Sequence, residues 1–265
     1  MIELYSHRDS LIHRMDARAK LVLTLAFIVC LNLLPSHAWA IYILFLSLVV
    51  SMMLLSKLRT GLVLKRSLIA LPFALAALPL IFTGSPPMAS LTLFGGFLLK
   101  FSLPGTERFA AIVVRSWISV QIAVLLAITT RFDDLMTALR QLKVPLLFVS
   151  IITLMWRYLF VILDEVTRML RARSSRSASA PTGLRSGGSL SWRARVTGGM
   201  AGSLFLRALE RSDRVYAAML SRGYGTEIPV NHNRPLSDAD RRILWFGSVL
   251  LLVLTLFGML IGGRP

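Results

Sequence analysis

The sequence has few acidic residues, few charged residues of any kind and almost no cysteine. Its 265 residues include 13 Asp and Glu against 30 Lys and Arg, which gives a formal net charge of +17 at pH 7. Charged residues make up 16% of the chain and hydrophobic residues 55%, whereas soluble domains carry about 25% charged residues. A soluble globular protein is therefore excluded. The single cysteine, Cys30, excludes an internal disulfide and a zinc site built from several cysteines.

The sequence also lacks the motifs of ATP hydrolysis and metal binding. No segment matches the phosphate-binding pattern G-x-x-x-x-G-K-[ST], so we expect any ATP hydrolysis to come from another chain. The four histidines have no metal-ligand spacing, so we predict no metal site, no cofactor and no catalytic residue. Nucleic acid is not an expected partner, because the basic segment 177–199 has Trp192 as its only aromatic residue.

Long apolar runs separated by basic connectors dominate what remains. A helix that crosses a membrane needs about 20 residues. Five segments come close to that length: Leu21–Leu34, Ala38–Leu55, Ser67–Thr83, Phe109–Thr130 and Ile243–Gly262. We therefore predict an all-α polytopic membrane protein with about five transmembrane helices. A short hairpin with a Gly-Gly turn is expected around Leu91–Leu98, between the third and fourth spans.

The positions of the cations predict the orientation of these spans. Lys and Arg gather in loops on the cytoplasmic side, and here they precede the first span and join the second to the third. We predict a multi-pass protein of the cell inner membrane, surrounded by the lipid bilayer, with a cytoplasmic N-terminus. Its parts are a membrane domain at 1–130, a helical cytoplasmic coupling domain inserted at 131–242 and a final transmembrane helix at 243–265.

Several charged residues near the predicted spans have a structural interpretation. Asp16, Arg18 and Lys20 are expected to form a charged collar at the inner end of the first span. Arg115, near the outer end of the fourth span, is expected either to extend to the interface or to pair with Glu107.

One apolar run inside the predicted coupling domain, Leu146–Leu163, is long enough to be a further span. If it crossed, the basic segment after it would lie outside, against the charge rule, and Arg157 would lie in mid-bilayer at a cost of at least about 2.5 kcal/mol. We therefore predict a helix packed under or shallowly within the membrane, with a spanning helix as the alternative. Arg157 is expected to pair with one of three carboxylates: Asp133, Asp134 or Asp164.

Two stretches of the predicted coupling domain match at a constant offset that places Arg176 over Arg222. Arg168–Ser177 and Arg214–Gly223 share an Arg, two apolar residues, a later Ala and then Ser-Arg followed by a small residue. Each predicts a short helix with an Arg in its last turn, a cation that is never neutralised at physiological pH. A single such Arg would only complement the helix dipole. Its recurrence predicts two equivalent contacts with a two-fold partner.

These features resemble the transmembrane (T) components of energy-coupling factor (ECF) transporters, specifically the CbiQ type of cobalt and nickel uptake systems. His13–Leu21 is similar to the family's opening motif L-x-x-[LM]-D-P-R-x-K-[LI], with Ala17 in place of the proline. Ser221-Arg222-Gly223 is similar to its coupling signature Ala-Arg-Gly. The first copy departs from that signature and reads Ser175-Arg176-Ser177. Arg173 in Ala172-Arg173-Ser174 is the alternative key residue of this copy.

The resemblance implies a scaffold without chemistry of its own. Two coupling helices would each insert an Arg-bearing end into one subunit of an ATP-binding cassette ATPase dimer. The membrane helices would hold a CbiM-like, substrate-binding S component, which would carry the cobalt or nickel. The implied coupling residues are Arg173, Ser175, Arg176, Ser177, Ser221, Arg222 and Gly223. The alternatives are a T component for a vitamin S component and a membrane-embedded, lipid-modifying enzyme.

Between the two matched stretches, segment 177–199 is rich in Ser and Gly and contains no acidic residue. This composition is typical of a flexible basic linker.

Overall fold

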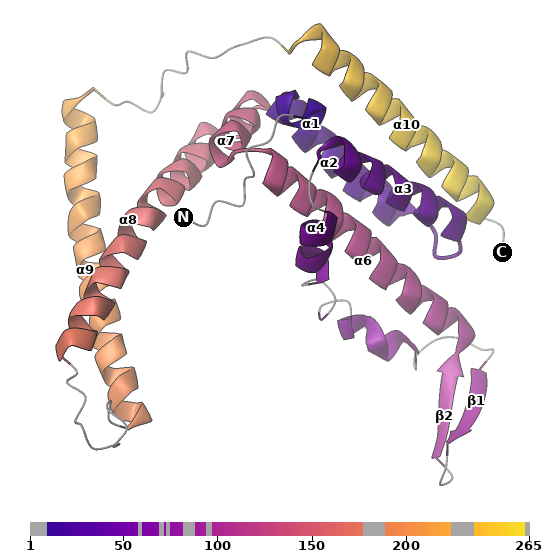
Figure 1. The fold of residues 1–265 in the computed structure, drawn as a ribbon, viewed down its shortest axis with the longest axis horizontal. Helices are drawn as coiled ribbons and strands as arrows, with labels where there is room; N and C mark the ends of the chain where they lie inside the picture. Colours follow the sequence, from indigo (N-terminus) through magenta and orange to yellow (C-terminus); the bar gives the residue numbers. More distant parts are fainter. Residues whose placement is uncertain are drawn as a thin grey trace. The chain divides into compact units, whose positions relative to one another are not determined.

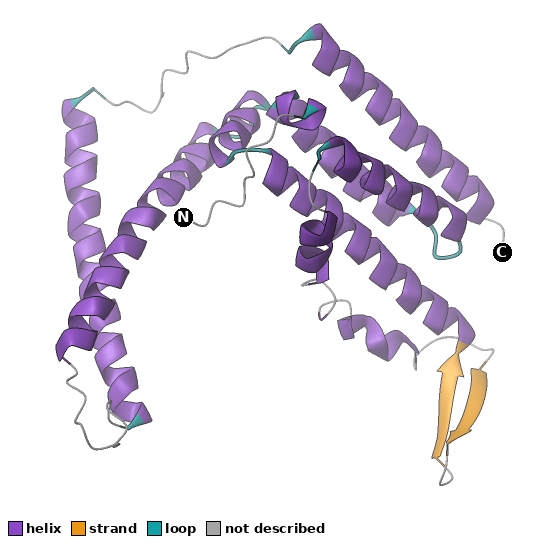
Figure 2. Ribbon diagram, in the orientation of Figure 1, coloured by secondary structure: helices purple, strands orange, loops and turns teal. Residues whose placement is uncertain are grey.

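Helices make up nearly all of the part of the chain that the structure describes, and one pair of short strands is the exception (Figure 2). The structure is a computed structural model that describes residues 10–57, 60–68, 72, 75–81, 88–93, 97–176, 189–223 and 236–262. The chain divides into two units, one formed by residues 1–142 and 234–265 and the other by residues 143–233. The predicted all-α fold class is confirmed.

Three helices form the core of the first unit. Helices α2 (Ala17–Leu33) and α3 (Trp39–Leu55) are joined by a short turn and pack with α6 (Leu103–Thr129), as Figure 1 shows. Their contact is apolar, and the buried rings of Phe27 and Phe45 meet edge to face with centroids 5.0 Å apart. These helices match the first, second and fourth predicted spans, although α6 begins earlier than expected because Ser102 caps it and Pro104 favours its first turn.

Helix α10 (Asp238–Gly262) matches the last predicted span and packs along α2 (Figure 1). Glycines allow this close approach. A Cβ at Gly258 would collide with the side chain of Leu34, and one at Gly247 would come within 2.7 Å of Leu23 Cδ2. These two contacts also show that α2 and α10 run parallel, because residue numbers rise along both helices in the same direction.

The third predicted span, Ser67–Thr83, is interrupted. Helix α4 (Thr60–Ser67) ends where the span was expected to begin, and the later part contains a 3₁₀ helix, η2 (Leu75–Ile81), with Pro79 inside it. Proline has no N–H to donate and its ring clashes with the preceding turn of an α-helix. In the described part of this segment, proline therefore replaces the expected continuous α-helix with a tighter 3₁₀ turn.

The predicted hairpin is confirmed and is longer than expected. Strand β1 (Met88–Leu93) pairs antiparallel with β2 (Phe97–Ser102), with Leu93 opposite Phe97. The expected Gly-Gly turn lies outside the described residues. The described part of this unit also contains two shorter helices: α1 (Leu11–Arg14) and α7 (Phe132–Gln141).

By length and hydropathy, three helices in the described part of the chain are able to cross a membrane: α6 from Pro104, α8 (Leu146–Arg176) and α10. Helices α2 and α3 have 17 residues each, which is the lower limit of about 17 for a span. The protein is therefore membrane-embedded.

The second unit consists of α8 and α9 (Leu190–Ser221), which cross each other in Figure 1. Two expectations were wrong here. Leu146–Leu163 and the first matched stretch do not form separate helices but lie on one helix of 31 residues. The expected linker does not extend to Gly199 either, because the Ser189 hydroxyl accepts a hydrogen bond from the backbone N–H of Trp192 and so starts α9 within it.

Candidate functional site

The α8–α9 crossing is held by a carboxylate that binds two arginines. The side chain of Glu165, 13% exposed, accepts hydrogen bonds from Arg207 Nη1 at 3.1 Å and Arg211 Nη2 at 3.0 Å. Further along α8, Arg173 Nη1 donates to the Thr197 hydroxyl at 3.1 Å. Glu165 contacts Arg211, whereas Arg173, later on α8, contacts Thr197, earlier on α9. The two helices are therefore antiparallel.

The sequence match has a counterpart in this geometry. Glu165 and Arg211 are 46 residues apart, the same separation as Arg176 and Arg222. A pseudo-two-fold axis that exchanges the helices at this offset therefore passes through the Glu165–Arg211 contact. Each of the two end arginines lies 11 residues beyond this contact on its own helix, a rise of about 17 Å. Arg176 and Arg222 thus lie on opposite sides of the crossing, at equal distances along the helices.

The two helix ends share local details as well. The Ser175 hydroxyl donates to the carbonyl of Ala172 at 3.0 Å, and the Ser221 hydroxyl donates to the carbonyl of Ala218 at 3.1 Å. Helix α9 ends at Ser221, and Gly223, just after the C-cap residue Arg222, has a φ of 71°, in the left-handed region that glycine adopts readily. Ser177, the equivalent position of the first sequence copy, lies outside the described residues.

The structure separates the two candidate arginines of the first copy. Arg173 is partly buried and is held against α9 by its bond to Thr197, whereas Arg176 is exposed in the last turn of α8. Arg222 is exposed in the same way at the end of α9. Arg157 is exposed, and within the second unit its expected pairing with Asp164 is not formed.

Sequence reasoning missed Glu165. The signal was available, because the offset that relates Arg176 to Arg222 also places Glu165 over Arg211, and these residues carry opposite charges. When two residues that are equivalent in the two copies contact each other, the two-fold axis that relates the copies passes through their contact. The carboxylates that were instead expected to pair with an arginine, Arg157, were Asp133, Asp134 and Asp164.

A charged collar surrounds the start of α2. Asp16 caps this helix by accepting the N–H of Arg18 at 2.9 Å, and Asp240 of α10 accepts the N–H of Asp16 at 3.4 Å. Lys20 Nζ donates to the carbonyl of Thr129, the last residue of α6, at 3.2 Å. Lys20 precedes the predicted span. The carboxylates of Asp134, Asp16 and Asp240 lie near Lys20.

The other end of the unit has a separate polar network. Arg115 Nε donates to the Tyr42 hydroxyl at 2.8 Å, and that hydroxyl donates to the carbonyl of Pro35 at 2.7 Å. Of the two alternatives for Arg115, the pairing with Glu107 is wrong, because Glu107 Oε1 lies 2.7 Å from His37 Nδ1 instead. These contacts tie α6 to the α2–α3 turn. The described residues contain no group of three His, Cys, Asp or Glu side chains suited to a metal ion.

Comparison with known proteins matches residues 8–232 to the model of a family described as CbiQ, cobalt transport protein. The chain is 27% identical to an uncharacterized protein of Methanocaldococcus jannaschii over 96% of this chain and 85% of that one. It is 25% identical to the energy-coupling factor transporter transmembrane protein EcfT of Lactococcus lactis, over 95% and 94%. It is 30% identical to the cobalt transport protein CbiQ of Rhodobacter capsulatus, over 69% and 68%.

Proposed function

Because this chain belongs to the CbiQ family of cobalt transport proteins, we propose that it is the energy-coupling membrane subunit of an ATP-driven ECF importer for cobalt. Such a subunit is a membrane component of a transporter and is not itself catalytic. The partners in this proposal are an ATPase dimer on the cytoplasmic side and a substrate-binding S component in the membrane.

The placement of Arg176 and Arg222 carries the proposal. Two exposed arginines lie at equal distances from a pseudo-two-fold axis, and a dimer of ATPases presents two equivalent surfaces about its own two-fold axis. A guanidinium keeps its charge at all physiological pH values and binds carboxylates through two parallel hydrogen bonds. Arg176 is the first coupling residue in this proposal, because Arg173 already binds within the α8–α9 pair.

The first unit supports a coupling pair that lies on one side of the membrane. Helix α6 ends beside Lys20, at the start of α2, and α10 begins at that same end because it runs parallel to α2. The chain between α6 and α10 therefore leaves and re-enters the unit at one face, so it crosses the membrane either an even number of times or not at all. Of the three described helices in this segment, α7, α8 and α9, α8 alone has the length and hydropathy of a span. If α8 lies along the membrane surface, the segment makes no crossing and the apolar side chains of α8 still contact the membrane.

That face is cytoplasmic in the proposal. The connectors at this end carry the excess of Lys and Arg that marks cytoplasmic loops. Helix α8 exposes a row of large apolar side chains at positions 147, 151, 155, 159 and 163, the spacing of one helix face. This face lies against the inner membrane surface or the S component, while the arginine ends point to the ATPases.

The proposal is tested by co-purification with the ATPase and membrane proteins encoded beside this chain. A double Arg176→Ala, Arg222→Ala variant is expected to lose the ATPases, because breaking a buried charge pair costs about 3–5 kcal/mol, or more than about 100-fold in Kd for each site. The single variants are expected to bind with intermediate affinity. ATP-driven transport should fall in parallel with ATPase binding.

The matched control is the double variant Arg168→Ala, Arg214→Ala. These arginines have the same 46-residue relation and are exposed on the same helices, but they lie two turns before the ends. This control is expected to retain the ATPases. Equal ATPase binding by the two double variants would contradict the coupling role of the helix ends.

Cobalt is the proposed substrate because the family model and the Rhodobacter relative carry that name. The complex is expected to support uptake of radioactive cobalt that depends on ATP and on a CbiM-like S component. Uptake of a vitamin, or of nickel without cobalt, would change the substrate but leave the coupling role standing.

A further inference from the structure

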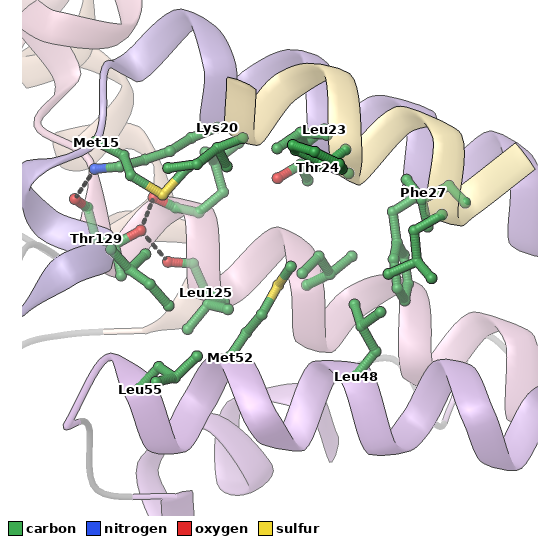
Figure 3. A pocket seen from close by; sticks show the side chains of 18 of the residues that line it. Met15, Lys20, Leu23, Thr24, Phe27, Leu48, Met52, Leu55, Leu125 and Thr129 are labelled. Carbon is green, nitrogen blue, oxygen red and sulfur yellow. Dashed lines mark hydrogen bonds between the residues drawn. The ribbon is translucent and has the colours of Figure 1, made fainter. Parts of the chain in front are cut away.

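A groove of about 660 Å³ lies in the first unit, lined by residues of α2, α3, α6 and α10 (Figure 3). Its walls are almost wholly apolar, with Phe27 from α2, Leu48 and Met52 from α3, and Leu125 from α6. From Ala239 to Leu251, the residues of α10 that line it cover about 18 Å of helix rise. Helix α10 leaves the groove accessible from outside the bundle, because Phe246 and Leu250 are 65% and 48% exposed.

The charge of the groove is confined to one end and has one sign. Among the residues that line it, Lys20 and Arg242 are the only ionisable ones. Figure 3 shows Lys20 beside Met15 and Thr129 at one end, while Phe27 and Leu48 lie toward the other. Because α10 runs parallel to α2, with Gly247 beside Leu23, Arg242 lies at the level of Lys20.

Both cations keep hydrogen-bonding capacity. Lys20 Nζ donates to the carbonyls of His13 and Thr129, at 3.3 and 3.2 Å, and an ammonium has a third proton. Arg242 Nε donates to the carbonyl of Asp238 at 3.3 Å. Its two terminal nitrogens have no hydrogen bond or ion pair with any residue that the structure describes. Carboxylates near Lys20 belong to Asp16, Asp134 and Asp240, and none of them lines the groove.

The lining of the groove favours a lipid over a protein helix, which is about 10 Å wide. A hydrocarbon chain is far narrower and needs only an apolar channel. A phospholipid also carries its charged headgroup at one end of its acyl chains, and the cations of this groove lie at one end of its lining.

We propose that this groove binds an acyl chain of an anionic phospholipid, with the phosphate of that lipid against Lys20 and Arg242. Basic pockets between membrane helices on the cytoplasmic side bind anionic headgroups in this way. The site would join α10 to α3 and α6 through the lipid. The inference is independent of the coupling function proposed above, because it involves the first unit alone.

The test uses the full chain reconstituted in nanodiscs of phosphatidylcholine mixed with phosphatidylglycerol, followed by native mass spectrometry of the extracted protein. The wild type is expected to retain one phosphatidylglycerol in preference to phosphatidylcholine. Arg242→Gln should lower that preference about fivefold, the effect of one cation near a membrane surface. Arg241→Gln is the matched control, because Arg241 is the neighbouring exposed cation, pairs with Asp238 at 2.6 Å and does not line the groove.

A second pair of variants tests the apolar part without changing charge. Leu250→Trp fills the groove and should abolish retention of the lipid, whereas Leu252→Trp, on the same helix but outside the lining, should not. Equal losses in the Arg241 and Arg242 variants, or retention that survives Leu250→Trp, would overturn the proposal. So would a membrane protein that co-purifies with the wild type and is lost, in place of a lipid, from Leu250→Trp.

Discussion

Replacing Glu165 with alanine should loosen the α8–α9 crossing. The carboxylate is 13% exposed and binds two guanidinium groups, but Arg207 is 59% exposed and so contributes little. Arg211 is 32% exposed and would lose a charge-assisted hydrogen bond of about 1.5–3 kcal/mol. We therefore expect a loss of about 2–3 kcal/mol in the free energy that docks α8 on α9, or about 30- to 150-fold in the docking equilibrium.

Pulsed electron paramagnetic resonance measures this effect directly. Cys30 is first replaced by serine, and nitroxide labels are then placed at Ser175→Cys and Ser221→Cys, two exposed positions near opposite ends of the pair. The distance between the labels depends on the crossing angle, so Glu165→Ala should broaden the distance distribution. Glu165→Gln, which keeps one carbonyl acceptor, should have a smaller effect.

The control and the rescue decide whether the carboxylate acts through its two arginines. Glu210→Ala removes a carboxylate whose contact with Arg214 is 4.0 Å long and 70% exposed on both sides, so it should leave the distribution unchanged. The swap Glu165→Arg with Arg211→Glu should restore the narrow distribution. A distribution for Glu165→Ala that matches that of Glu210→Ala would refute the reasoning.

Two further predictions concern stability, measured by thermal unfolding of the purified chain in detergent. Gly258→Leu should destabilise the contact of α10 with Leu34 by about 1–3 kcal/mol, whereas Gly199→Ala, in open space on α9, should be neutral or stabilising by up to about 1 kcal/mol; equal effects of the two would contradict the close approach of α10. Asp16→Ala should cost about 1 kcal/mol because it removes the cap bond to the N–H of Arg18, and Asp16→Asn, which keeps an acceptor, should cost less.

The sequence was sufficient for the helices of the first unit that have uninterrupted apolar runs. Ala38–Leu55 and the last span were predicted to within a few residues, because each run is bounded by a turn or by charge. The third span was misjudged because its apolar composition was weighed above Pro79, which disrupts α-helical hydrogen bonding. An apolar composition indicates that a segment is buried in the membrane, whereas a proline within it determines whether its backbone forms a continuous α-helix.

In the second unit the sequence located the arginine-bearing ends but not the helices that carry them. Hydropathy falls along α8 after Leu163, and this change was interpreted as the boundary between two elements although no helix breaker follows. The Ser and Gly content of 190–199 was likewise interpreted as a linker, but the cap at Ser189 and the helix formers around Trp192 favoured a helix. The Glu165 contact is long-range, and only the repeat offset pointed to it.

The position of Glu165 makes the α8–α9 pair a lever with equal arms. Each arginine end lies about 17 Å along its helix from the pivot, so a rotation of about 10° about the crossing displaces either end by about 3 Å. Equal forces applied at the two ends in opposite directions exert a torque and no net push. Two ATPases that press on the two ends with equal and opposite forces would therefore rotate this pair without translating it, whereas a force on one end alone would both rotate and translate it.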